Sequence, residues 1–264
     1  MRIFWDGIVE PAIVALRARV IVEIGSEGGE NTNALLAYCE RYDAVLHVID
    51  PRPRFDVRAW QQRHGSRFVV HATLSLQALS TIDAIDVVLI DGDHNWYTVV
   101  NELRFLDRQC ARAGRPFPLI LLHDIGWPYG RRDMYYDPAT IPDAFRQPCA
   151  MMGIRWNESG LAANGVNPHL WNATAENTPR NGVLTAVEDF LKETEQSLRL
   201  IQIPGFFGLG ILFRERLPNE NEAFARFLAT WDLPDSIRAY VTMLEHNRVQ
   251  LLTTAMELWT ANQK

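Results

Sequence analysis

Short apolar runs alternate with stretches of helical periodicity in the first half of the chain. An apolar run bounded by turn residues is typical of a buried parallel strand, whereas apolar positions three and four residues apart indicate a helix. Strands are therefore expected at residues 20–24, 44–49, 67–70, 85–90 and 119–122. Helices are expected at residues 6–19, 57–63, 76–80 and 96–112, and a further helix that Asn31 or Thr32 can cap ends near Arg41. This repeated strand–helix order predicts a parallel sheet with right-handed crossovers.

The second half of the chain has a different order of elements. A helix is expected at residues 183–197, followed by strands at 198–203 and 210–214. Only a short loop rich in Pro and Gly separates these strands, so they should pair antiparallel. Residues 220–262 have helical spacing, with a break near Leu233-Pro234. The pattern predicts an α/β fold with a mainly parallel seven-stranded sheet, an antiparallel last strand, helices on both faces and a helical C-terminal tail.

We expect one domain at residues 1–218, with an insertion at 125–181, and a helical extension at 219–264. The insertion is far longer than an ordinary connection and is rich in Trp, Tyr and Arg. Our interpretation is a lid or substrate-binding segment, and the alternative is a surface excursion with a small core of its own. Apolar stripes in the extension suit core packing or contact between subunits, so a homo-oligomer through the C-terminal helices is a reasonable expectation.

Composition narrows the classes of partner. Of 264 residues, 47% are hydrophobic and 22% charged, as in ordinary globular proteins, and a net charge of −6 argues against nucleic acid. No apolar stretch approaches the roughly 18 residues of a membrane span, and the start has no signal-peptide pattern. Three distant cysteines form neither a zinc spacing nor a disulfide framework, which favours a cytoplasmic setting.

Polar clusters follow two of the predicted strands. Asp91-Gly92-Asp93-His94 comes after one strand, and His123-Asp124 ends the next. Ligands of parallel sheets bind beyond the carboxyl ends of the strands, so these side chains should share one crevice. Carboxylates and imidazoles suit a divalent cation such as Mg²⁺ or Mn²⁺, and His94 beside Asp91 is a candidate general base. The alternatives are a helix-capping acid and hydrogen-bonded structural histidines.

A glycine-containing turn follows the first strand. The turn, which leads into a helix, is Glu23-Ile24-Gly25-Ser26-Glu27-Gly28-Gly29. Asp50 ends the next strand, where a carboxylate can accept a hydrogen bond from a ribose hydroxyl. The spacing is not G-x-G-x-x-G, so a nucleoside ligand without phosphates fits better than a dinucleotide. The alternative is an ordinary strand-to-helix turn with a capping acid.

These motifs together resemble those of class I S-adenosylmethionine-dependent methyltransferases, and they imply that Rossmann-like fold. The resemblance rests on Val22-Glu23-Ile24-Gly25, on Asp50, on Ile90-Asp91-Gly92-Asp93-His94 and on Leu122-His123-Asp124. It covers about residues 18–125 and again 181–213. Within the class, the chain resembles the metal-dependent branch that includes macrolide-sugar O-methyltransferases and cephalosporin-hydroxylase-type proteins.

The resemblance implies a role for each matching residue. The implied cofactor-binding residues are Glu23, Gly25, Ser26 and Gly28 for the methionine part, Asp50 for the ribose, Thr73 near the adenine, and Asp91. Asp91 and Asp124 would bind Mg²⁺, and His94 would take the proton of the substrate hydroxyl. Sugar-methylating members have Glu where this chain has His123, so His123 is a candidate ligand for a softer ion.

The acceptor is expected to be a small hydroxyl-bearing molecule, such as a sugar or another natural product. Candidate substrate contacts lie early in the insertion, at Trp127, Tyr129, Arg131 and Arg132. Three other functions stay open at this point: a metal-dependent hydrolase or phosphoesterase, an NAD-linked oxidoreductase that lacks the usual fingerprint, and a cofactor-binding protein without turnover.

Overall fold

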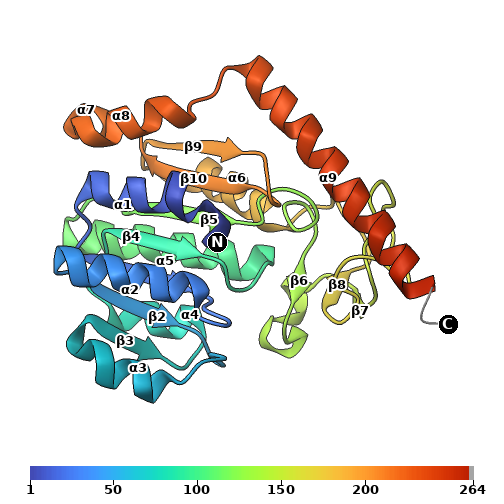
Figure 1. The fold of residues 1–264 in the computed structure, drawn as a ribbon, viewed down its shortest axis with the longest axis horizontal. Helices are drawn as coiled ribbons and strands as arrows, with labels where there is room; N and C mark the ends of the chain where they lie inside the picture. The colour runs from blue at the N-terminus through green and yellow to red at the C-terminus, as the bar shows by residue number, and fades with distance from the viewer. Residues whose placement is uncertain (262–264) are drawn as a thin grey trace.

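A seven-stranded sheet forms the centre of the molecule (Figure 1). The computed structural model describes residues 1–261, with side chains through Leu258. The strands, in spatial order, are β3 (Phe68–His71), β2 (Val45–Ile49), β1 (Val20–Ile24), β4 (Val87–Ile90), β5 (Leu119–His123), β10 (Leu209–Arg214) and β9 (Leu198–Ile203). β10 runs antiparallel to both of its neighbours, and the first five strands are parallel. The predicted sheet and its antiparallel last strand are confirmed.

Helices cover both faces of this sheet, which explains why the strands are almost continuously apolar. Ile21 and Leu89 face the side covered by α1 (Glu10–Leu16), α2 (Glu30–Tyr42) and α8 (Glu222–Trp231). Val22 and Val88 face the side covered by α4 (Ser75–Ala78), α5 (Trp96–Ala113) and α6 (Val183–Glu193). The remaining short elements are α3 (Val57–His64), α7 (Leu217–Glu220), and the 3-10 helices η1 (Arg2–Phe4), η3 (Gly65–Arg67) and η4 (Leu79–Thr81).

Two helix starts differ from the sequence prediction. The segment before β1 begins as a π-helix, η2 (Trp5–Val9), and becomes α-helical only at Glu10. α2 begins at Glu30 with Gly29 as its N-cap, so the prediction that Asn31 or Thr32 caps it is wrong. Both side chains point into the protein instead, where they donate hydrogen bonds to Glu23 of β1.

Residues 125–181 contain a second, three-stranded sheet in the order β6 (Met134–Tyr135), β8 (Trp171–Ala173) and β7 (Cys149–Met151). Two 3-10 turns, η5 (Pro138–Thr140) and η6 (Asp143–Phe145), connect β6 to β7. Tyr129, Met134 and Ile154 form a small apolar core for this part of the chain.

The carboxylate of Asp133 ties this segment to the main sheet. Its Oδ1 accepts from the backbone N–H of Trp96 at 2.7 Å and of Gly182 at 2.6 Å, while Tyr135 donates to Oδ2 at 2.7 Å. Trp96 is the first residue of α5 and Gly182 is the N-cap of α6. One buried carboxylate thus satisfies donors at the N-termini of two helices, where negative charge is favourable.

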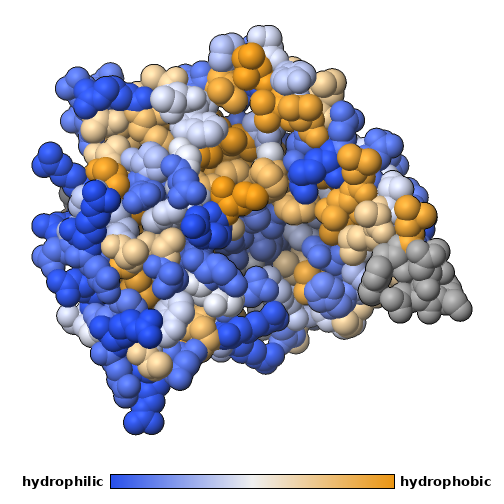
Figure 2. Space-filling model, viewed as in Figure 1, coloured by the Kyte–Doolittle hydropathy of each residue, from blue (hydrophilic) through white to orange (hydrophobic). Residues whose placement is uncertain are grey.

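The C-terminal helix α9 (Asp235–Ala261) follows the predicted break and crosses the outside of the 125–181 segment (Figure 1). Hydrophobic residues recur along its outward surface (Figure 2). Within the described residues, no helix combines the length and apolarity that crossing a bilayer requires.

Candidate active site

The carboxyl ends of β1 to β5 bring most of the predicted site residues to one edge of the sheet. The glycine turn follows β1, Asp50 follows β2, Thr73 lies just beyond β3, Asp91 follows β4, and Asp124 follows β5. The strand order changes direction between β1 and β4. Such a switch point is where ligands bind in open parallel sheets, so the edge is the candidate active site.

Gly25 allows β1 and β4 to approach each other at this edge. Its φ is +85°, and a Cβ atom there would lie only 2.3 Å from the main-chain oxygen of Asp91. Any other residue would force the glycine turn and the Asp91 turn apart. Ser26 and Gly28 lie in the same turn.

Asp50 holds the shape of the glycine turn. Its Oδ2 accepts from the backbone N–H of Ser26 at 2.9 Å, from the Ser26 hydroxyl at 2.8 Å and from the backbone N–H of Glu27 at 3.1 Å. Its Oδ1 accepts from the backbone N–H of Arg52 at 2.7 Å. Thr73 is half-buried beyond β3 and donates to Gln77.

Glu23 is a buried acid directly behind the turn. It is 1% exposed, and it accepts from Asn31 at 2.8 Å and from Thr32 at 2.6 Å. Burial raises the pKa of Glu23 to about 7, although the two hydrogen bonds oppose the shift. Glu23 therefore titrates near neutral pH, between β1 and α2.

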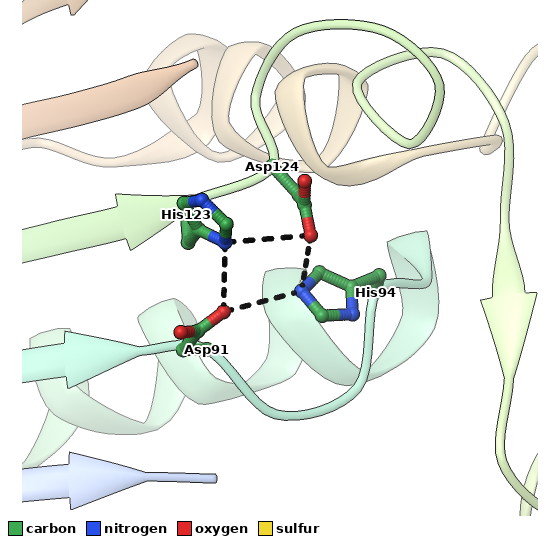
Figure 3. Close-up of side chains that lie close together, drawn as sticks. All are labelled: Asp91, His94, His123 and Asp124. Atoms are coloured by element: carbon green, nitrogen blue, oxygen red, sulfur yellow. Dashed lines mark hydrogen bonds and ion pairs between the residues drawn. The ribbon is translucent and has the colours of Figure 1, made fainter. Parts of the chain in front are cut away.

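Four side chains converge at the ends of β4 and β5 (Figure 3). Nδ1 of His123 lies 2.9 Å from Oδ1 of Asp91, and Nε2 of His94 lies 2.9 Å from Oδ2 of Asp124. Contacts of 3.5 Å between His94 and Asp91 and of 3.4 Å between His123 and Asp124 complete a ring of four contacts. We call these four residues the square. Asp124 has a left-handed φ of 57°, at the point where the chain leaves β5. The four ligand atoms all lie within 4.8 Å of one another.

The charges in this square balance each other. Burial alone would lower the pKa of both histidines, but the two carboxylates outweigh it and raise the pKa of His94 to about 10 and that of His123 to about 9. Burial would likewise raise the pKa of both acids, yet the imidazoles hold the pKa of Asp91 and of Asp124 well below the usual range. Without a bound cation, both imidazoles are protonated and both acids ionised at neutral pH.

The donor set of the square fits a divalent cation. Two carboxylate oxygens and two imidazole nitrogens point at a common centre, and His94 is only 7% exposed, with no partner for Nδ1 in the described part of the chain. Nε2 of His123 lies 3.2 Å from the carbonyl oxygen of Phe206. That contact suits an Nε2–H donor and turns Nδ1 toward the centre, as outer hydrogen bonds do around metal-binding histidines.

Other residues enclose the square, and most of them carry no local signal in the sequence. The ammonium group of Met1 lies 2.6 Å from Oδ2 of Asp91, and the ring of Phe4 meets the ring of His123 edge-on at 5.7 Å. Tyr129 stacks on His94 with ring centroids 5.6 Å apart. The N-cap of α5 is Asn95, so the alternative that Asp91 or His94 serves only as a helix cap is excluded.

Two of the four predicted substrate contacts line a cavity of about 500 Å³. Trp127 and Arg131 border it, together with Trp156 and four residues of α9: Thr242, Glu245, His246 and Val249. None of the four residues of the square lines this cavity, but its lining includes Ile125 and Gly126, which follow Asp124 in the sequence.

The other two predicted contacts point elsewhere. Arg132 is fully buried and donates to the main-chain oxygens of Ala173 and Ser159, so the structure corrects its assignment from substrate contact to internal support of the insertion. The hydroxyl of Tyr129 is held by Asn172 and Asn167, which leaves only its ring facing the site.

Comparisons with known proteins place the first part of the chain in a protein class. Residues 22–125 match a family model described as a methyltransferase domain. No curated protein matches the sequence.

Solved structures of low sequence identity resemble the chain. An S-adenosylhomocysteine-bound methyltransferase of Podospora anserina is 15% identical with a TM-score of 0.47, over 78% of this chain and 76% of that one. An S-adenosylhomocysteine-bound O-methyltransferase of Bacillus cereus is 16% identical with a TM-score of 0.39, over 77% of each chain. A protein of Staphylococcus aureus described as a caffeoyl-CoA O-methyltransferase is 10% identical with a TM-score of 0.40, over 76% of this chain and 78% of that one.

The methyltransferase-domain match covers the five parallel strands and ends just beyond Asp124. The match agrees with the class that the sequence motifs predict, and the sheet order with its antiparallel β10 is the predicted one. Residues 22–125 are thus similar to a methyltransferase domain.

Proposed function

We propose that this methyltransferase methylates a hydroxyl group of a small polar molecule, such as a sugar or another natural product, with the help of a divalent cation. The observation that carries the proposal is the square of Asp91, His94, His123 and Asp124, whose ligand atoms lie within 4.8 Å of one another beside the glycine turn. A methyl transfer from a sulfonium to oxygen needs a nucleophile that is close to deprotonated and in line with the methyl group.

Asp91, His123 and Asp124 are the proposed ligands of the cation. When bound, a divalent cation lowers the pKa of a coordinated hydroxyl and fixes its orientation. Mg²⁺ and Mn²⁺ are the expected ions, and the imidazole of His123 favours Mn²⁺ or a softer metal over Mg²⁺. The ammonium of Met1 occupies Oδ2 of Asp91, so it leaves Oδ1 facing the square.

His94 is the proposed general base. With a pKa of about 10 it holds a proton in the cation-free square, and it cannot accept another there. Positive charge placed against Asp91 and Asp124 would weaken their hold on that proton and bring the pKa of His94 back toward neutrality. Tyr129, stacked on the ring, keeps Nε2 directed at the acids.

The cofactor and the acceptor are proposed to lie on two sides of the square. The turn with Glu23, Gly25, Ser26 and Gly28 would hold the methionine part of S-adenosylmethionine. Asp50 would accept from the ribose, Thr73 would lie near the adenine, and Asp91 would face the methionine end. The acceptor would enter the cavity bordered by Trp127 and Arg131, whose lining includes Ile125, the residue after Asp124 in the sequence.

Binding and turnover measurements test this function separately. Titration calorimetry with S-adenosylhomocysteine should show binding, which a hydrolase or an NAD-linked enzyme would not give. Transfer of a labelled methyl group to a panel of sugars and catechol-type diols should then require Mn²⁺ or Mg²⁺ and stop in EDTA. Binding without turnover on the whole panel would favour a cofactor-binding protein instead.

The variant Asp124→Asn sharpens the test. It should raise the metal concentration needed for half-maximal activity before it lowers the thermal midpoint of unfolding. Equal activity of the variant and the wild type at every metal concentration would contradict the role of Asp124 as a ligand.

A further inference from the structure

Beyond its exposed first residue, Asp235, helix α9 turns its charged residues toward the protein and large apolar residues toward solvent. Between Ser236 and Leu258 its acidic and basic residues are Arg238, Glu245, Arg248 and Glu257, and none of these four is exposed. A lone surface helix has the opposite arrangement, because charged side chains favour water and apolar ones favour the core. The helix therefore has an outward face that a monomer does not explain.

The inward charges are held by contacts with Phe207 and Arg155 and by a pair within α9 itself. Glu245 accepts from the backbone N–H of Phe207 at 2.9 Å and pairs with Arg248 at 2.7 Å. The guanidinium of Arg248 lies 4.6 Å from the ring centroid of Phe207. Glu257 pairs with Arg155 of the 125–181 segment at 3.0 Å. These contacts fix the rotation of α9, so the outward face cannot turn inward without breaking them.

The outward face is lined by large apolar side chains. We call the following residues the outer face of α9, with their exposed fractions: Ile237 47%, Tyr240 54%, Met243 48%, Leu244 46%, Leu251 71% and Leu258 62%. Figure 2 shows hydrophobic surface along the helix. Large exposed apolar residues gathered on one side of a helix mark an interaction surface.

The spacing of the outer face points to another helix as its partner. Ile237, Leu244, Leu251 and Leu258 follow one another at intervals of seven residues. Strict seven-residue spacing keeps one stripe of a helix facing a partner helix along its length, as in coiled coils. The same stripe on a second copy of the chain has the same spacing, so a two-fold axis would place its four apolar residues against those of the partner, with the exposed Asn247 and Thr254 between them.

We propose that the outer face of α9 is covered by the α9 helix of a second copy of this protein. Charge argues for this occupant over a membrane or an acidic partner. Helices that lie on membranes carry free Lys and Arg beside the apolar face, whereas Arg238 and Arg248 are engaged with their own chain, and the protein has a net charge of −6. An uncharged face is matched best by another uncharged face. The proposal does not depend on the methyl-transfer reaction.

Sedimentation equilibrium of the full chain between about 1 and 200 μM tests the proposal. The wild type should show a reversible monomer–dimer equilibrium. Leu251→Asp and Leu244→Asp each place a carboxylate in the apolar contact, and each should weaken dimerisation at least tenfold, which is about 1.4 kcal/mol. Both positions are exposed in the monomer, so the variants should keep the wild-type circular dichroism spectrum.

Gln62→Asp is the matched control, because Gln62 is exposed on α3 and the change adds the same charge far along the sequence from α9. It should dimerise like the wild type. A wild type that stays monomeric over the whole range would overturn the proposal, as would dimers that both Leu variants leave intact. A monomer that floats with phosphatidylcholine vesicles would assign the face to a membrane and overturn it as well.

Discussion

His123 of β5 and Asp91 of the neighbouring β4 face each other with 2.9 Å between Nδ1 and Oδ1. The two residues belong to adjacent parallel strands whose pairing places Ile90 beside Leu122, one residue before each. Strand register alone therefore brings an imidazole against a carboxylate at the sheet edge. In the proposed cation site, this pair would supply one nitrogen ligand and one oxygen ligand.

His123 should determine which metal ion the protein prefers. Imidazole nitrogen binds Mn²⁺ and later transition metals better than Mg²⁺, which favours oxygen. We expect calorimetry to show at least about tenfold tighter binding of Mn²⁺ than of Mg²⁺ in the wild type. His123→Glu should narrow that difference, and His169→Glu, at an exposed histidine outside the square, should leave it unchanged. An unchanged preference in His123→Glu would remove His123 from the ligand set.

Metal binding should strengthen as the pH rises. In the cation-free square, His94 and His123 have pKa values raised to about 10 and about 9, so protons compete with the cation at neutral pH. For each proton that the cation displaces, the affinity for the cation rises about tenfold per pH unit until the pH passes the pKa of that histidine. Titrations at pH 7 and 8 in two buffers of different ionisation enthalpy should therefore report net proton release. A pH-independent affinity would show that neither imidazole must lose a proton.

His94→Ala separates catalysis from cofactor binding. Its Nε2 faces Asp124 and Asp91 rather than the glycine turn, so the affinity for S-adenosylhomocysteine should change little. Turnover should fall by roughly 10²-fold or more if His94 accepts the proton of the acceptor hydroxyl. The measurement is kcat for methyl transfer at saturating metal, compared with binding by calorimetry. Full activity in the variant would exclude His94 as the base.

Glu23 should make folding stability depend on pH. Its pKa is raised from 4.5 to about 7, so the native state holds a proton that the unfolded state has released between these values. Stability from this group is therefore present at low pH and is lost as the pH rises toward 7, by an amount on the order of 2–3 kcal/mol. In urea unfolding, the stability of the wild type relative to Glu23→Gln should decline from pH 5 to pH 8. A constant difference would mean that Glu23 does not titrate in this range.

Asp133 should be essential for attaching the 125–181 segment. Asp133→Ala would leave the buried N–H groups of Trp96 and Gly182 without acceptors, at a cost of about 3 kcal/mol or more in the free energy of unfolding. Asp137→Ala removes an acceptor from the same segment, but its partner Ala139 lies in an exposed turn, so a loss below about 1 kcal/mol is expected. Chemical denaturation of both variants tests the contrast, and equal losses would contradict the anchoring role of Asp133.

The sequence by itself determined the sheet and the residues at its edge. The apolar runs that end at Asp91 and Asp124 are local signals, because a strand buried on both faces must be apolar along its whole length. Once five such strands are parallel, their carboxyl ends meet, and Asp91, His94, His123 and Asp124 lie close together at one edge of the sheet. Neither step required knowledge of which helix packs where.

Only the tertiary structure decided where polar side chains outside the strands point. Thr32 looked like a helix cap but reaches the buried Glu23, and Arg132 looked like a substrate contact but supports main-chain carbonyls inside the insertion. No local pattern indicates that Asp133 joins the N-termini of two helices. It also predicted the apolar stripe of α9 without showing which side faces solvent. Periodicity fixes the face of an element on which a residue lies, but only long-range packing decides what that face meets.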